Sequence, residues 1–200
     1  MEEDQNFLKV KIKFLIIILT LLFTSKSYCE KIVLKKIVEL DSPWGSSFIS
    51  NNEIIVTEKS GRIKIVDILS KEIQEVSHQL DFVVHGQGGL LDIIYKDNNV
   101  WISYTEDRGN YKTSTSIARA ELNKKKLDFK NIFQANPPID SGYHFGSRLA
   151  IKDNYIYASA GERGQGMIAQ DASKHPGSII RIHLDGSIPK DNPKFKNKKK

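Results

Sequence analysis

Cysteine is nearly absent from this chain of 200 residues, in which Cys29 is the only one. Within the chain, a single thiol excludes a disulfide bond and any metal centre built from several thiolates. Long hydrophobic runs are lacking too: the longest, Phe14 to Phe23, has ten residues, whereas a helix needs about 20 to cross a bilayer. Apolar residues at helical spacing are scarce, which disfavours a helical fold. We therefore expect a β-rich protein without a stable membrane anchor.

An excess of basic charge is absent from the body of the chain, although the net charge of the whole is +6. The C-terminal residues 190–200 carry a net charge of +5 and residues 1–29 carry +1, so residues 30–189 are neutral. A nucleic-acid groove needs basic side chains spread over a binding face. We therefore expect no nucleic-acid partner.

The N-terminus has the anatomy of an export signal. Three lysines precede the short apolar run, and small and polar residues follow it, which is the order of a secretory signal peptide. Cleavage after Cys29 would make residues 1–29 the signal peptide and would place the protein in the periplasm or outside the cell. The alternatives are an uncleaved anchor and a lipoprotein acylated at Cys29, although the bulky Tyr28 disfavours the second.

Three segments of the remaining chain can be laid over one another: residues 45–58, 89–106 and 146–162. Each contains a glycine, an apolar strand, a turn rich in Asn or Asp, a second apolar strand and a final glutamate. Asn and Asp tolerate positive φ and therefore suit tight hairpins. The segments begin 44 and 57 residues apart, close to the blade period of about 40–50 residues in β-propellers.

Later strands of each repeat are visible in residues 62–66, 116–122 and 178–184, which are rich in isoleucine and alternate in polarity. The pattern predicts an all-β fold, a β-propeller of four-stranded antiparallel blades, of which about three are present. Closure around an axis takes at least four blades. We therefore expect residues 30–193 to be the N-terminal half of a longer propeller and the Lys-rich residues 194–200 to mark a truncation point. A homodimer that closes the ring is the alternative.

Three side chains near the repeat boundaries could do chemistry together: the amide of Gln87, the imidazole of His144 and the carboxylate of Glu162. An imidazole backed by a carboxylate is a common general base near neutral pH, and an amide can orient a hydroxyl. If the repeats are blades around one axis, the three residues could meet at one end of it. They are our candidate catalytic residues.

Each candidate also has a structural interpretation. Gln87 could cap backbone amides in its glycine-rich turn. Glu162 could close a turn, since Glu58 and Glu106 recur at the ends of the other two segments. His85 beside the glycines is expected to have a loop role, and Arg148 is expected to donate to backbone carbonyls between blades.

Several motifs in order resemble one known family, the soluble PQQ-dependent aldose sugar dehydrogenases, which are related to soluble quinoprotein glucose dehydrogenase and grouped with sorbosone dehydrogenases. The resemblance spans about residues 33–193 and implies an exported six-bladed propeller. The motifs that carry it are Pro43-Trp-Gly, Val56-Thr-Glu, Gly61-Arg-Ile, Gly86-Gln-Gly-Gly-Leu-Leu-Asp, His144-Phe-Gly-Ser-Arg-Leu, Ala169-Gln-Asp and Asp185-Gly-Ser-Ile-Pro-Lys-Asp-Asn-Pro.

The resemblance implies a role for each candidate residue. His144 matches the base that takes the proton from the anomeric hydroxyl of an aldose while hydride leaves that carbon for the quinone, which yields the lactone. Gln87 matches the amide that contacts the same hydroxyl. Glu162 stands where relatives often carry an aspartate that orients the base, so its arm is one methylene longer.

The implied cofactors are PQQ and a calcium ion that would polarise the quinone carbonyl. The resemblance places most of their ligands in later blades, so the cofactor-binding residues are unknown here and no metal ligand is assigned. An Asp-x-Asp-x-Asp calcium loop is also lacking. The electron acceptor is unknown.

Two other function classes remain open. The first is an exported, non-catalytic propeller that binds carbohydrate, and the second is an inactive fragment. A hydrolytic propeller such as a lactonase is a weaker rival, because it would need a calcium ion held by carboxylate and Asn side chains in the channel, and the sequence offers no such set.

Overall fold

A computed structural model describes residues 13, 15 and 31–194 of the chain. The expected signal peptide, residues 1–29, lies outside the described residues except for Lys13 and Leu15, and so do residues 195–200 of the Lys-rich end. The chain divides into two units, Met1–Lys36 and Ile37–Lys200. In the first unit, residues 31–36 have no regular secondary structure. None of the helices in the described part of the chain is both long and apolar enough to cross a membrane.

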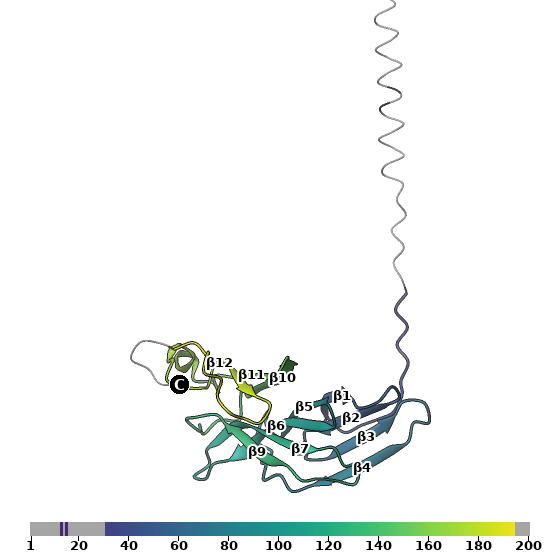
Figure 1. The fold of residues 1–200 in the computed structure, drawn as a ribbon, viewed down its shortest axis with the longest axis horizontal. Helices are drawn as coiled ribbons and strands as arrows, with labels where there is room; N and C mark the ends of the chain where they lie inside the picture. Colours follow the sequence, from purple (N-terminus) through teal and green to yellow (C-terminus); the bar gives the residue numbers. More distant parts are fainter. Residues whose placement is uncertain (1–12, 14, 16–30, 195–200) are drawn as a thin grey trace, which may run out of the picture. The chain divides into compact units, whose positions relative to one another are not determined.

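The second unit contains three β-sheets, which follow one another along the chain apart from one short strand (Figure 1), and a 3-10 helix, η1 (Gly166–Gln170). The first sheet has the order β1 (Pro43–Phe48), β2 (Glu53–Glu58), β3 (Ile63–Asp67), β4 (Ile73–His78) and β8 (Lys126–Leu127). The second has the order β5 (Leu90–Lys96), β6 (Asn99–Asp107), β7 (Thr113–Glu121) and β9 (Lys130–Gln134). The third has the order β10 (Gly146–Lys152), β11 (Tyr155–Ala160) and β12 (Ser178–His183).

Within each sheet, consecutive strands pair in antiparallel register, with β8 as the parallel exception. Such a meander is the blade of a propeller, so the predicted all-β propeller fold is confirmed. The predicted hairpin turns are confirmed at Asp97, Asn98 and Asp153, which have φ of 47°, 60° and 54°. At Asn52 the turn is made differently, because Ser50 Oγ accepts a hydrogen bond from its main-chain N–H at 3.3 Å.

The strand count differs from the prediction of four per blade in two of the sheets. The first sheet gains β8 from the connection between β7 and β9; this strand pairs Ser77 with Lys126 and His78 with Leu127. An edge strand presents unpaired backbone groups, and a two-residue addition satisfies some of them. The third sheet has three strands among the described residues. The chain turns back after β12 at Asp185-Gly186, where the N–H of His183 donates to the carbonyl of Ser187 at 2.9 Å, without forming a fourth strand.

Each sheet has a β-bulge in its first hairpin, and the three bulges fix how the repeats correspond. The register shifts fall between Pro43 and Ser46, between Leu90 and Ile93, and between Gly146 and Leu149. Gly45, Asp92 and Arg148 are therefore equivalent positions. The alignment of the three repeats from the sequence equated Gly45 with Gly89 and Gly146 and was wrong: the strand register makes Pro43, Leu90 and Gly146 equivalent, so the three glycines do not mark the same position.

The same strand register shows that the glutamates that end the three repeats do not all occupy equivalent positions. Glu58 pairs with Pro43, as Tyr104 pairs with Leu90 and Ala160 with Gly146. Glu106 lies two residues after Tyr104, and Glu162 lies two residues after Ala160. Glu58, in contrast, itself occupies the position that is equivalent to Tyr104 and Ala160. Glu58 is therefore not the counterpart of Glu162.

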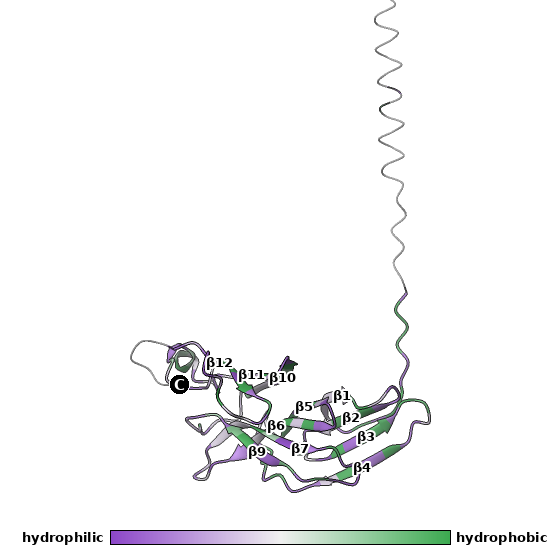
Figure 2. Cartoon of the chain, viewed as in Figure 1, coloured by the Kyte–Doolittle hydropathy of each residue, from purple (hydrophilic) through white to green (hydrophobic). Residues whose placement is uncertain are grey.

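Two hydrophobic clusters join the sheets. One face of the second sheet, including Ile102 and Tyr104, packs with Ile55 and Ile63 of the first sheet. The other face contributes Trp101 and Ile117 to a cluster with residues of the third sheet. In Figure 2 hydrophobic colour accordingly recurs along the strands of all three sheets.

The bulge residues link the sheets directly. A Cβ on Gly45 would lie 2.7 Å from Cα of Asp92, so only glycine permits this approach. The buried carboxylate of Asp92 accepts hydrogen bonds from Arg148 Nη1 at 3.0 Å and from the N–H of Leu149 at 2.7 Å. Arg148 thus donates to a carboxylate of the neighbouring blade. We expected Arg148 to donate to backbone carbonyls, and this was wrong. Asp92 occupies the equivalent bulge position of the second sheet, and its carboxylate accepts the hydrogen bond instead.

Candidate active site

The three candidate residues lie on connections at one end of the strands. Gln87 precedes β5, His144 precedes β10, and Glu162 follows β11. Gly146 at the start of β10 pairs with Ala160 at the end of β11. The segments that carry His144 and Glu162 therefore leave the third sheet at the same end of these two strands. The β-bulge next to this pair twists the end of β10, and bulges commonly re-aim side chains beside active sites.

His144 and Glu162 form a hydrogen-bonded pair through Nδ1 of the imidazole and Oε1 of the carboxylate. Oε1 also accepts a hydrogen bond from the N–H of Gly164 at 3.1 Å. A carboxylate is an acceptor, so in the neutral imidazole the proton resides on Nδ1 and the lone pair on Nε2. The longer arm of glutamate therefore still reaches the imidazole.

The pair is partly open to solvent, with side-chain exposures of 54% for His144 and 28% for Glu162. The hydrogen bond from His144 lowers the pKa of Glu162 below its ordinary value, although partial burial works against this. The carboxylate thus stays ionised over the range in which an imidazole can act as a base. Among the described residues, Nε2 of His144 has no hydrogen-bond partner.

Gln87 contacts the same histidine through the backbone. Its Oε1 accepts a hydrogen bond from the N–H of His144 at 2.9 Å, and its own N–H donates to the carbonyl of Gly142 at 2.8 Å. The amide oxygen is therefore engaged, and Nε2 of Gln87 remains as the donor that can meet a ligand oxygen. The structure thus brings all three sequence-predicted residues together.

Backbone shape at the site depends on Gly161. A Cβ at this position would overlap the carbonyl oxygen of His144, and the N–H of Gly161 donates to the carbonyl of Phe145 at 3.0 Å. His144 itself has a φ of 49°, in the left-handed region that non-glycine residues seldom adopt and that is enriched at functional sites.

Arg163 is a site residue to which the sequence analysis gave no role. It is 3% exposed, and its guanidinium lies 3.5 Å from the ring centroid of Phe145. Nε donates to the carbonyl of Tyr143 at 2.8 Å, and Nη2 donates to Oγ1 of Thr113 at 2.8 Å. Burial lowers the pKa of Arg163 to about 10, so the group is still protonated at neutral pH. The sequence signal was its place in the Gly161-Glu-Arg-Gly turn, directly beside Glu162.

The other two glutamates that end the repeats are engaged elsewhere. Glu58 is fully buried and paired with Arg62 and Lys64 within the first sheet. Glu106 accepts hydrogen bonds from Ser116 at 2.7 Å and from Gln134 at 2.7 Å and 2.8 Å. Glu162 alone of the three repeat-ending glutamates bonds to a histidine.

A cleft of about 500 Å³ opens beside the Gln87 loop. It lies between residues 83–85 and the loop that joins β6 to β7, and its lining includes His85, Asp107, Tyr111 and Thr113. His85, for which a loop role is expected, lies against Gly142. The volume is in the range of small-molecule sites.

The described part of the chain contains no group of three or more His, Cys, Asp or Glu side chains that could hold a metal ion. Calcium needs six to eight oxygen ligands, and we therefore assign no calcium ligand to these residues.

Successive antiparallel blades with a hydrogen-bonded histidine–carboxylate pair at one end define a β-propeller with a candidate active site. The family model for glucose/sorbosone dehydrogenase matches residues 40–200, and the chain belongs to this family. The resemblance seen in the sequence motifs is thereby confirmed.

Similar proteins agree with this assignment. The chain is 32% identical over 168 residues to aldose sugar dehydrogenase YliI of Escherichia coli, and the match covers 79% of this chain and 45% of that protein. The crystal structure of the soluble aldose sugar dehydrogenase from E. coli in the apo-form superposes with a TM-score of 0.74, at 32% identity, and covers 79% of this chain and 48% of that one.

The PQQ-bound form of an aldose sugar dehydrogenase from Streptomyces coelicolor gives a TM-score of 0.72 at 25% identity, and covers 81% of this chain and 51% of that one. The chain thus spans about half the length of the relatives it matches.

Proposed function

We propose that the protein oxidises an aldose at the anomeric carbon to the lactone in a PQQ-dependent reaction, with His144 as the general base. The observation that carries the proposal is the bond between Nδ1 of His144 and Glu162, which leaves the Nε2 lone pair free to accept a proton. The family assignment and the PQQ-bound relative support the cofactor.

The residues of this chain perform the proton half of the reaction. Nε2 of His144 takes the proton of the anomeric hydroxyl as the C–H bond of the same carbon breaks and the C=O bond forms. Glu162 holds the ring in the correct tautomer and stabilises the imidazolium that results. The Nε2 donor of Gln87 positions the hydroxyl oxygen. When bound, PQQ supplies the acceptor for the hydride and calcium would supply a Lewis acid beside it.

The rest of the site lies outside this chain in the proposal. Residues 30–193 would form the N-terminal half of the propeller, and the cofactor ligands would come from the other half. A homodimer of half-propellers is the alternative source of the missing blades. The export signal proposed for residues 1–29 would place the enzyme in the periplasm or outside the cell, where an acceptor of unknown identity would take up the two electrons.

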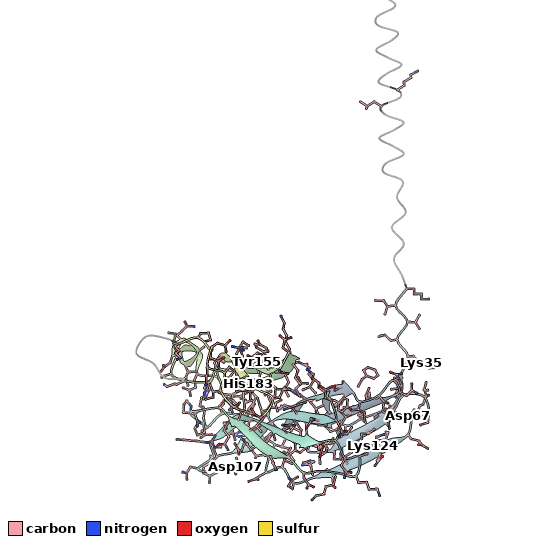
Figure 3. All side chains as sticks on the ribbon, viewed as in Figure 1. Lys35, Asp67, Asp107, Lys124, Tyr155 and His183 are labelled. Carbon is pink, nitrogen blue, oxygen red and sulfur yellow. The ribbon has the colours of Figure 1, made fainter. Side chains whose placement is uncertain are left out.

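The test uses the complete reading frame that contains this chain. The purified protein is assayed for reduction of a redox dye by aldoses, with and without PQQ and calcium, and with the variants His144→Ala and His183→Gln. We expect turnover that requires PQQ and falls about 100-fold or more in His144→Ala. His183 is the control histidine, because it lies on the third sheet beside Tyr155, with ring centroids 4.9 Å apart, and has no part in the His144–Glu162 pair (Figure 3).

The competing functions give different results in the same assay. A carbohydrate-binding propeller would bind aldoses, as calorimetry would show, without reducing dye in the presence of PQQ and calcium. An inactive fragment would neither bind nor turn over. Equal activity in His144→Ala and wild type would show that His144 is not the general base.

A further inference from the structure

Arg163 is a buried cation that forms no direct ion pair among the described residues; the carboxylate of its chain neighbour Glu162 acts on it only through space. Its hydrogen bonds go to neutral groups: the carbonyls of Thr113, Ser141 and Tyr143 and the hydroxyl of Thr113. Burying an arginine without a direct ion pair is costly: desolvation is the leading cause of the lowered pKa of Arg163, about 10, and the charge of Glu162 offsets it only in part.

The partners of Arg163 surround the histidine. Ser141 and Tyr143 precede His144 in the loop, and Phe145, whose ring lies under the guanidinium at 3.5 Å, follows it. Thr113 is the first residue of β7 in the second sheet. Arg163 therefore fastens both flanks of His144 to a strand of the neighbouring blade.

The backbone of Arg163 carries the other half of the pair. Glu162 is its chain neighbour, and Arg163 has a φ of 59°, so the guanidinium and the carboxylate leave the same sharp turn. Arg163 thus contacts the loop that carries His144 through its side chain, and it belongs to the turn that carries Glu162 through its backbone. The planar fork of arginine can reach four acceptors at once, which the single ammonium of lysine cannot do.

We propose that Arg163 is a positioning residue that holds the His144 loop against the Glu162 turn, so that Nδ1 of the imidazole stays on the carboxylate. This inference rests on the proposed function, in which His144 is the base. It adds a residue that touches neither substrate nor the reacting atoms and acts only through the loop.

The test compares Arg163→Met, Arg163→Lys and Arg119→Met in the complete protein. Arg119 is the matched control: its guanidinium also lies over an aromatic ring, 5.5 Å from the centroid of Trp101, and it bonds to Asn99. We measure kcat and KM by dye reduction, and the pKa of the Glu162 carboxyl by carbon NMR, assigned with Glu162→Gln.

We expect Arg163→Met to lower kcat about 10- to 100-fold with little change in KM, because a small displacement of a catalytic group has effects of this size. The pKa of Glu162 should rise toward its ordinary value as the bond from His144 weakens. Arg163→Lys keeps the positive charge. If the pKa of Glu162 rises in this variant as well, the cause is the displaced His144 loop and not the loss of the charge. Arg119→Met should leave kcat and the Glu162 pKa at wild-type values.

A folded Arg163→Met protein with wild-type kcat and an unchanged Glu162 pKa would overturn the proposal and leave Arg163 a purely structural residue. If Arg163→Met does not fold, Thr113→Val removes one acceptor of the guanidinium at nearly constant volume and should shift kcat and the Glu162 pKa in the same directions; unchanged values there would be equally decisive. The NMR measurement needs no cofactor. It therefore tests Arg163 even if the wild-type protein reduces no dye, a result that would refute the proposed function instead.

Discussion

The main-chain N–H of His144 donates a hydrogen bond to Oε1 of Gln87 across 57 residues of sequence, at 2.9 Å. The N–H of Gln87 donates in turn to the carbonyl of Gly142, so the two loops are joined twice. The amide of Gln87 is thereby oriented: its oxygen faces the backbone of His144 and its Nε2 is left for a ligand. The structural interpretation of Gln87 and its proposed catalytic role are therefore compatible, because the oxygen of the amide meets the backbone of His144 and the proposed role needs only the nitrogen.

Substitutions of Gln87 should separate these two tasks. Gln87→Glu keeps an acceptor for the N–H of His144 and removes the donor, so we expect kcat/KM for aldoses to fall about 10-fold, the equivalent of one hydrogen bond, while the melting temperature stays within about 2 °C. Gln87→Ala removes both ends and should lower kcat/KM and the melting temperature. Steady-state kinetics and thermal unfolding of the two variants measure this. Equal kinetics for Gln87→Glu and wild type would show that the amide does not touch the substrate.

Glu162 should make stability depend on pH in a defined direction. Its pKa is lowered in the folded protein, mainly by the hydrogen bond from His144. The unfolded state therefore binds the proton more readily, and the contribution of Glu162 is complete above about pH 4.5 and is lost as the pH falls through the folded pKa. The free energy of unfolding of wild type minus that of Glu162→Gln should shrink below pH 4.5. A difference that is constant from pH 7 to pH 3 would contradict the bond.

Asp92 and Arg148 should contribute unequally to stability although they form one ion pair. The Asp92 side chain is 5% exposed and also accepts from the N–H of Leu149, whereas the Arg148 side chain is 74% exposed. Asp92→Ala leaves a buried donor unsatisfied and should cost about 2 kcal/mol or more. Arg148→Ala removes an exposed partner and should cost less than about 1 kcal/mol. Urea unfolding of both variants compares them, and an equal loss would mean that the ion pair, not the backbone bond, is the dominant interaction.

The sequence predicted the strands and their order because alternating β-branched residues and Asn or Asp turns are local signals. It could not reveal the bulges, which shift the register at Gly45, Asp92 and Arg148 by a residue that the apolar pattern does not mark. Strand β8 was missed because two residues carry no periodicity. Arg163 was missed for a related reason: a buried arginine and an exposed one look the same in a glycine-rich turn, and only the tertiary contacts distinguish them.

Gly161 gives the sharpest test of how the site is shaped, because a methyl group there would overlap the carbonyl oxygen of His144. The backbone cannot retreat easily, since the N–H of Gly161 already bonds to the carbonyl of Phe145 at 3.0 Å. We expect Gly161→Ala to displace the His144 loop, to lower kcat about 10-fold or more, and to lower the melting temperature. Gly166→Ala is the matched control, because a Cβ at Gly166 meets nothing within 4 Å, and it should change stability by no more than about 0.5 kcal/mol. Kinetics and thermal unfolding of the pair decide the matter: if Gly161→Ala behaves as Gly166→Ala does, the loop tolerates displacement and the close approach is not what positions the base.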